Sequence, residues 1–300
     1  PAQLEVVDIA GLVRGASRGE GLGNRFLAAI REVDAILHVL RCFEDEDVAH
    51  VEGGVDPVRD AELIETELLL ADIGGLERRI EGLSKRVRGG DAEARRQLAL
   101  IEQIRPAMEE GTPARRLRLD PEQCLTLRSL QLLTAKPLLY LCNVDEASAA
   151  SGNAWSAAVE TWARAQGAPA VVIAAAIEAE IAALADDERG EYLAALGLER
   201  PGLDRLIRAG YRLLDLITFL TAGPKEARAW PVRRGTTAAE AAGTIHSDFQ
   251  RGFICAEVIR YQDYLRCHGE AGAREAGLMR QEGRDYIVED GDVVHFRFNV

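Results

Sequence analysis

The first apolar runs of the chain are short and are separated by a loop and an amphipathic stretch. Residues 4–7 form a short run that is apolar except at Glu5 and ends at Asp8, and a glycine-rich loop follows. An amphipathic segment at 24–32 then leads into a second apolar run at 35–40. This order predicts a strand, a loop, a helix and another strand.

Two later apolar runs repeat this pattern. They lie at 137–142 and 170–174, and a helical stretch at 155–165 separates them. Strands that alternate with helices favour a mostly parallel sheet covered on both faces. The sequence therefore predicts an α/β fold.

The segment between the two halves of this pattern has a different period. Its apolar residues recur at spacings of four and three, which predicts a long helix with a heptad stripe: Leu69, Ile73, Leu76, Ile80, Leu83 and Val87. Gly89 and Gly90 break that helix. A second amphipathic helix follows, with Leu98, Ile101, Ile104 and Met108 on one face, so we expect an antiparallel hairpin resembling a short coiled coil. Asp120 as N-cap and Pro121 at the first helical position predict a third helix.

The end of the chain again changes character. After an amphipathic helix at 203–214, short extended runs surround one helix at 237–249 and are joined by glycine-containing turns; the runs lie at 216–220, 227–232, 253–259 and 293–298. This predicts a compact α+β unit. The expected division is one α/β domain from 1–56 and 135–214, a helical insertion at 57–134, and a C-terminal domain at 215–300.

Composition narrows the class of protein. The net charge of −13 argues against a protein that coats nucleic acid non-specifically, because neutralising phosphates requires clustered Lys and Arg. Residues 57–134 hold 13 basic and 14 acidic side chains, so nearly all the excess negative charge lies elsewhere. A surface that meets RNA is therefore expected in the insertion, and no binding to DNA is expected.

The cysteines, the histidines and the apolar runs argue against metal-binding, disulfide-linked and membrane-spanning proteins. The five cysteines show no C-x-x-C spacing, which indicates neither a zinc site nor a disulfide framework. His246, His268 and His295 match no familiar metal-site spacing. No apolar run approaches the roughly 18 residues needed to cross a bilayer, so a cytoplasmic protein without a membrane partner is expected.

The first chemical motif is Asp8-Ile9-Ala10-Gly11, which ends an apolar run. At the carboxyl end of a strand in an α/β sheet, such a carboxylate can hold Mg²⁺ through water while the Gly11 amide approaches a terminal phosphate. Alone, D-x-x-G is a weak signal, and a solvated turn at the end of a strand is its commoner explanation. However, residues 8–45 as a whole resemble the corresponding stretch of the Obg-like branch of P-loop GTPases, and most closely its YchF subfamily.

This resemblance implies a P-loop NTPase G domain that binds ATP, or alternatively GTP, with Mg²⁺. Asn143-Val144-Asp145-Glu146 stands where GTP-specific relatives have N-K-x-D, and the subfamily's N-x-x-E variant is associated with ATP. The alternative is that Asp145 and Glu146 cap the next helix. Ala174 and Ala175 stand at the base-contacting S-A-K or S-A-A loop, with Ala174 replacing the usual Ser.

Leu12 stands where many GTPases have the Gln that positions the attacking water. Leucine can neither orient nor polarise water, so the resemblance implies slow hydrolysis and we assign no catalytic side chain. The glycine-rich loop from Leu12 to Asn24 is expected to move with the nucleotide state.

The C-terminal unit and the insertion complete the resemblance. Residues 221–259 and 283–300 look like the TGS domain, a β-grasp module, in the version that closes YchF proteins. The family associates with the ribosome, which favours the basic tip of the insertion, with Arg86, Arg88 and Arg95, as the partner-binding surface. The alternative is an ordinary solvated helix pair whose charges serve solubility. We expect a monomer.

A phosphate-binding loop of the form G-x-x-x-x-G-K-[ST] is absent from the 300 residues. None of the three lysines, Lys85, Lys136 and Lys225, follows a glycine. The glycines at 19, 21 and 23 do not make a dinucleotide-binding loop, because Asn24 follows where a glycine would be needed. We therefore expect a fragment whose phosphate loop lies upstream; the alternative is a natural degenerate protein that has lost catalysis.

Together these features predict a nucleotide-dependent switch that binds and slowly hydrolyses ATP, or GTP, and associates with the ribosome. The rival is a nucleotide-gated RNA- or ribosome-binding module with negligible turnover. A purely structural protein would have no affinity for triphosphate at all.

The absent phosphate loop gives a first prediction. The chain 1–300 should bind Mg²⁺-ATP very weakly, because the amides that cradle phosphates and the lysine that neutralises them are missing. Isothermal titration calorimetry measures this directly. A micromolar dissociation constant for this chain would show that the phosphates are bound by other residues.

Overall fold

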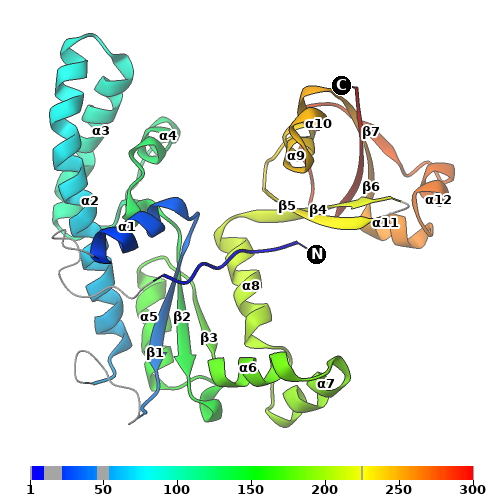
Figure 1. Cartoon of the computed structure of the whole chain (residues 1–300), viewed down its shortest axis with the longest axis horizontal. Coiled ribbons are helices and arrows are strands. Elements are labelled where there is room, and N and C mark those ends of the chain that lie inside the picture. Colours follow the sequence, from blue (N-terminus) through cyan, green and yellow to red (C-terminus); the bar gives the residue numbers. More distant parts are fainter. Residues whose placement is uncertain (1, 10–21, 46–53, 224–225, 300) are drawn as a thin grey trace. The chain divides into compact units, whose positions relative to one another are not determined.

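The computed structural model describes residues 2–9, 22–45, 54–223 and 226–299. These fall into two compact units, Val7–Ala209 and a second made of Pro1–Val6 with Gly210–Val300. Each unit has its own sheet (Figure 1). Each also has its own buried core. Among the described helices, none is both long enough and apolar enough to cross a membrane.

The first unit is built on a parallel sheet. Strands β1 (Ile36–Cys42), β2 (Leu138–Val144) and β3 (Ala170–Ile173) lie in the order β1-β2-β3, and both pairings are parallel. Every residue of β2 except Asn143 is buried. A strand covered on both faces must be apolar almost throughout, which explains why β2 could be predicted from the sequence. The strands predicted at 35–40 and 170–174 and the α/β fold are also confirmed, although Val39 of β1 is 56% exposed.

Residues 4–7 are not a strand, so that prediction was wrong. They have no regular secondary structure, and the side chains of Val6 and Val7 are 72% and 54% exposed. A strand needs a hydrogen-bonded neighbour, and none of the described residues forms a ladder with this segment. Its apolar pattern alone does not supply that partner.

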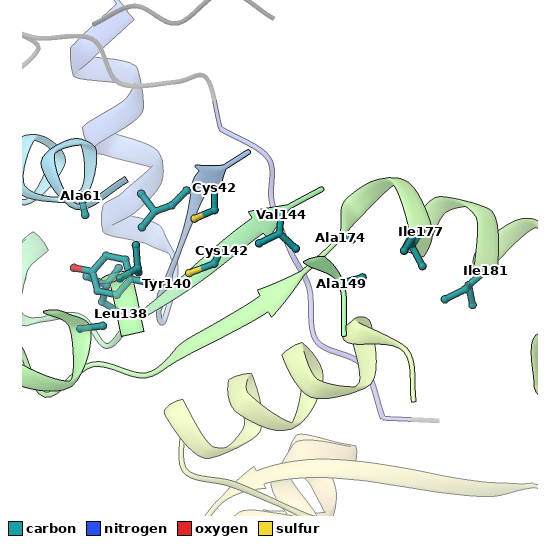
Figure 2. Packing of buried hydrophobic residues seen from close by; sticks show 13 residues of the cluster. Cys42, Ala61, Leu138, Tyr140, Cys142, Val144, Ala149, Ala174, Ile177 and Ile181 are labelled. Carbon is teal, nitrogen blue, oxygen red and sulfur yellow. The ribbon is translucent and has the colours of Figure 1, made fainter. Parts of the chain in front are cut away.

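Helices pack against the sheet and provide the apolar core. One face, with Leu40, Tyr140 and Cys142, is covered by α2 (Pro57–Arg88) through Ala61 and by α5 (Ala154–Ala165). Helix α6 (Ala175–Ala183) adds Ile177 and Ile181 to the same core (Figure 2). Two further helices follow, α7 (Asp186–Ala195) and α8 (Gly202–Leu213), of which only α8 was predicted.

The segment between β1 and β2 contains the helical hairpin that the heptad stripe predicted. Helix α2 runs without a break for 32 residues and is followed by α3 (Ala92–Glu109). Gly89 caps α2 and Gly90 has φ +85°, a conformation that glycine adopts without steric cost. Figure 1 shows the two helices side by side, extending away from the sheet of the same unit.

The third helix, α4 (Pro121–Leu130), has the predicted N-terminus. The side chain of Asp120 accepts a hydrogen bond from the backbone of Gln123, and the Gln123 side chain accepts one from Asp120 in return. Short 3-10 turns at Ala114–Arg116 and Leu133–Ala135 connect these helices to one another and to β2. Leu76, Leu83, Ile101 and Ile104 share one buried cluster with Leu130.

A buried carboxylate in the middle of α2 forms a clamp that holds this helix to the segment before β2. Asp72 is 4% exposed, and its two oxygens accept hydrogen bonds from the backbone amides of Leu133 and Thr134, both at 2.8 Å, and from the Thr134 hydroxyl at 2.7 Å. Burial raises the pKa of Asp72, while the bonds from Thr134 and Leu133 oppose that rise.

Helix α1 (Leu22–Glu32) packs beside this clamp. Its Leu27 and Ile30 form a cluster with Leu68 and Ala71 of α2 and with Leu133. The Lys136 ammonium donates hydrogen bonds to the carbonyls of Arg31 and Val33, at 3.0 and 2.5 Å, and so satisfies groups that the end of α1 would leave unpaired.

The second unit has a five-stranded mixed sheet in the order β5-β4-β8-β6-β7. Its strands are β4 (Leu216–Ala222), β5 (Ala227–Arg233), β6 (Phe253–Arg260), β7 (Arg280–Glu282) and β8 (Asp292–Phe298). The bridge between β4 and β8 is parallel and the other pairings are antiparallel. Four of these strands were predicted, whereas β7, which has only three residues, was not.

The helix predicted at 237–249 is in fact two helices. They are α9 (Ala238–Ile245) and α10 (Ser247–Arg251), and His246 between them has the extended φ of −161°. The His246 Nδ1 accepts a hydrogen bond from the Asp248 amide at 3.1 Å, which starts the second helix. The short helices α11 (Tyr261–Arg266) and α12 (Glu270–Glu275) follow β6.

The Asp72 clamp leads to a prediction about stability. Asp72→Ala leaves three buried donors without an acceptor, so the free energy of unfolding should fall by about 2 to 4 kcal/mol. Because the folded pKa is raised, the stability that Asp72 adds is fully present below about pH 4 and declines as the pH rises through the folded pKa.

Urea denaturation at several pH values measures both effects. The control is Asp187→Ala, which removes an exposed carboxylate from the first turn of α7 and should change stability by no more than about 0.5 kcal/mol. Equal losses in the two variants would show that the clamp contributes nothing specific.

Candidate functional site

The carboxyl ends of the three parallel strands meet at one edge of the first sheet. In the register, Cys42 of β1 lies beside Val144 of β2, and Asn143 lies beside Ile173 of β3. Ligands in open α/β folds bind outside this edge. The sequence-predicted residues Asn143, Val144, Glu146, Ala174 and Ala175 all lie at or directly after these strand ends.

A hydrogen bond connects the two loops that the sequence analysis assigned to the base. The Asn143 Oδ1 accepts a hydrogen bond from the backbone amide of Ala175 at 3.0 Å. Asn143 is the half-buried, next-to-last residue of β2, and Ala175 is the first residue of α6. Two motifs that are more than thirty positions apart in the sequence are therefore joined at one point.

Val144 lies beneath the hydrogen bond between Asn143 and Ala175, and its side chain is not exposed there. Its side chain is 4% exposed and packs in the core cluster with Ala149 and Ala174. Figure 2 shows these three residues close together at the end of β2. Exchanging Val144 for lysine would bury a charge, so this residue supports the loop from below.

In the turn after β2, two neighbouring acidic residues have different roles. The Asp145 side chain accepts a hydrogen bond from the Ser148 amide at 2.8 Å and caps the 3-10 turn Glu146–Ser148. Capping was the alternative considered for both acidic residues, and in the structure Asp145 performs it. The neighbouring Glu146 is exposed at the same edge of the sheet.

Ala174 is the N-cap residue of α6, and its side chain makes no capping hydrogen bond. It is 3% exposed, whereas Ala175 is exposed. A serine at this position could cap the helix with its hydroxyl. The loop is therefore held by groups supplied from elsewhere, of which Asn143 is one.

Asn153 is a structural residue at this edge that the sequence analysis did not identify. Its amide Nδ2 donates to the carbonyl of Cys42 at 2.7 Å, and its Oδ1 accepts from the Ser156 amide at 3.0 Å, which caps α5. It thus joins the end of β1 to α5. Asn followed three residues later by Ser was the available sequence signal.

The candidate metal-binding segment is described only in part. Asp8 is exposed, and the next residue, Ile9, packs against the cluster formed by α1 and α2. Gly11 and Leu12, together with most of the glycine-rich loop, lie outside the described residues. Within the described ranges, no group of three or more His, Cys, Asp or Glu residues is placed to hold a metal ion.

The predicted partner-binding arginines lie at the tip of the α2–α3 hairpin. Arg86, Arg88 and Arg95 are all exposed. However, Arg86 forms an ion pair of 2.6 Å with Asp91, the N-cap residue of α3, and so belongs to the turn itself. The Nε of Arg88 donates to the Ser84 carbonyl at 3.3 Å, which leaves its other guanidinium nitrogens exposed to a partner.

Comparison with protein-family models assigns both ends of the chain. Residues 1–69 match a model described as a 50S ribosome-binding GTPase. Residues 216–299 match the C-terminal model of YchF GTPases, which is described as a protein of unknown function.

Similar proteins and a solved structure extend this assignment over the full chain. The ribosome-binding ATPase YchF of Haemophilus influenzae is 54% identical over 300 residues, which are 100% of this chain and 82% of the relative. Its Bacillus subtilis counterpart is 48% identical with the same coverage, and Obg-like ATPase 1 of Oryza sativa is 42% identical, with 76% of its length covered. The structure of the Schizosaccharomyces pombe YchF GTPase superposes with a TM-score of 0.84 at 35% identity, covering 95% of this chain and 78% of that one. The chain therefore belongs to the YchF family of Obg-like P-loop nucleoside triphosphatases.

Proposed function

We propose that the protein is a nucleotide-dependent switch that binds and slowly hydrolyses ATP, with GTP as a second substrate, and associates with the ribosome. The observation that carries this proposal is the bond between Asn143 and Ala175, which holds the two candidate base loops together. The relatives named as ribosome-binding ATPases support it. Cytoplasmic location and a monomeric state are part of the same proposal.

In this proposal the base lies between the turn at Glu146 and the start of α6. The floor and side of the base site are formed by Asn143, Ala174 and Ala175. Val144 supports these residues from the core. The exposed Glu146 carboxylate offers acceptors only. It therefore suits a base that presents an amino group, and its extra methylene compared with aspartate alters the fit to guanine.

The phosphate end is assigned to the segment that begins at Asp8. Its exposed carboxylate supplies an oxygen ligand, the type that Mg²⁺ prefers, and would hold the ion through water. Gly11 would approach the terminal phosphate. Leu12 supplies no proton acceptor, which supports slow turnover.

The remaining parts are proposed to contact the partner. Residues 57–134 form the insertion, whose tip carries the basic side chains, and 1–56 with 135–214 form the G domain. We assign 215–300 to a TGS domain of the β-grasp type, because its mixed sheet has β4 parallel to β8 and packs α9 against its core.

The rival function is a ribosome-binding module in which turnover is incidental, and Leu12 is the feature that favours it. ATP hydrolysis by the protein expressed from its complete reading frame, measured with and without ribosomes, distinguishes the two functions. Steady-state ATP hydrolysis that rises when ribosomes are added supports the switch. Residual turnover that ribosomes leave unchanged supports the binding module.

Nucleotide preference gives a prediction at Glu146. Because Val144 is buried, the informative change is Glu146→Asp alone, which restores the carboxylate length found in GTP-specific relatives. The ratio of GTP to ATP affinity should rise about fivefold for each additional hydrogen bond to the base. Competition binding measures the ratio, with the exposed Glu191→Asp as control. An unchanged ratio would place base recognition on other residues.

Ribosome association gives a prediction at the hairpin tip. Arg88→Glu with Arg95→Glu should weaken co-sedimentation with ribosomes and make it less dependent on salt. The log–log slope should fall by about 0.7 to 0.9 for each phosphate that the protein no longer neutralises. Arg86 is left intact because its pairing with Asp91 stabilises the turn.

The matched control is Arg105→Glu with Arg128→Glu. It makes the same change in net charge at solvent-accessible positions of α3 and α4, away from the tip, and should leave co-sedimentation near the parental level. If both double variants co-sediment like the parent at low and high salt, the tip is not the contact, and the C-terminal unit becomes the better candidate.

A further inference from the structure

The start of α6 is held from a second side by a glutamate that the motifs do not include. The two carboxylate oxygens of Glu178 accept hydrogen bonds from consecutive backbone amides, Gly202 at 2.6 Å and Leu203 at 3.1 Å. These amides begin α8, whose first donors have no partner within their own helix. The carboxylate also lies at the positive end of the helix dipole, which favours its charge.

The fit around this contact is close. Gly202 is buried, and a Cβ built on it would lie 2.9 Å from both the Glu178 Oε1 and the Cγ1 of Ile173. Any larger residue would have to displace either the glutamate or the last residue of β3. Glycine at 202 therefore lets α8 begin directly against α6 and β3.

Glu178 lies one helical turn after Ala174, and its own amide donates to the Ala174 carbonyl at 3.1 Å. The next residue before it, Ile177, is 1% exposed and anchors α6 in the core. The first turn of α6 is thus fixed at its beginning by Asn143, at its buried face by Ile177, and at its end by Glu178. No side chain of the loop itself contributes a cap, since Ala174 has none to offer.

We propose that Glu178 is a positioning residue for nucleotide recognition: by fastening α6 to the start of α8, it holds the Ala174–Ala175 loop where the base is bound. This inference rests on the proposed function of that loop. Glu178 does not contact the base; it acts through the backbone that does. The carboxylate performs from a distance the bracing that a serine hydroxyl at 174 would perform locally.

The test compares a ligand that has a base with one that has none. In the protein expressed from its complete reading frame, Glu178→Ala should raise the dissociation constant for Mg²⁺-ATP about tenfold, which corresponds to 1.4 kcal/mol. Binding of Mg²⁺ with inorganic triphosphate, measured by competition, should stay at the parental level because this ligand does not reach the loop. Glu178→Gln keeps one acceptor oxygen and should fall between the parent and the alanine variant.

The control is Glu188→Ala, which removes a glutamate that accepts one local hydrogen bond at the start of its own helix, α7. There the Glu188 carboxylate accepts from the Ala185 amide at 3.3 Å, on an exposed helix start. Its ATP affinity should equal that of the parent. If Glu178→Ala fails to fold, as judged by thermal unfolding, the graded loss in Glu178→Gln still decides the question.

Three results would overturn the inference. Equal weakening of ATP and inorganic triphosphate would mean that Glu178 stabilises the unit in general and does not position the base loop. Parental ATP affinity in the Glu178 variants, together with loss in Asn143→Ala, would remove Glu178 and leave the proposed function standing. Parental affinity in the Asn143 variant as well would remove the proposed base site itself.

Discussion

The central strand β2 is the constraint on which the candidate site depends. It pairs on both edges and is buried along almost its whole length, so its position cannot shift without disturbing β1, β3 and the helices that cover them. A parallel strand ends where its neighbours end, and here the first polar side chain at that end is Asn143. Its amide is consequently aimed at the start of α6 by the packing of the whole sheet.

The edge of the sheet where the strands end also shows how a loop without polar side chains of its own can be held in place. Ala174 and Ala175 provide only backbone groups at their end of the site. Rigidity comes from Asn143 on the strand and from Glu178 farther along the helix, each of which accepts hydrogen bonds from the backbone. The bonds to the Glu178 carboxylate are stronger than neutral ones, and they fasten the start of α8 to α6.

Helix α2 connects the parallel sheet to the α2–α3 hairpin because it contributes to three buried clusters. Its first half contributes Ala61 and Leu68 beside the sheet and α1, and its second half contributes Leu76 and Leu83 to the hairpin. Asp72 lies between these halves and is saturated by hydrogen bonds from the segment before β2. The α2–α3 hairpin therefore shares an unbroken helix with the part of the unit that surrounds the sheet.

Much of this organisation follows from sequence alone. The apolar runs of β1, β2 and β3, the heptad stripe of α2 and the Asp120-Pro121 cap are local signals, and the structure contains each of these elements. The family resemblance rests on continuous motifs and is likewise a property of the sequence.

Tertiary structure decided the other features of the site and its surroundings, because each of them depends on a partner that is distant along the chain. Residues 4–7 look like a strand but have no ladder partner among the described residues, and Val144 looks like a site residue but is buried beneath the loop. Arg86 looks available to a ligand but is paired with Asp91, and Glu178 looks like an ordinary helix residue but caps α8. Periodicity reports which side of an element is apolar; it does not report which polar group will meet which backbone amide, and that pairing sets the geometry of the site.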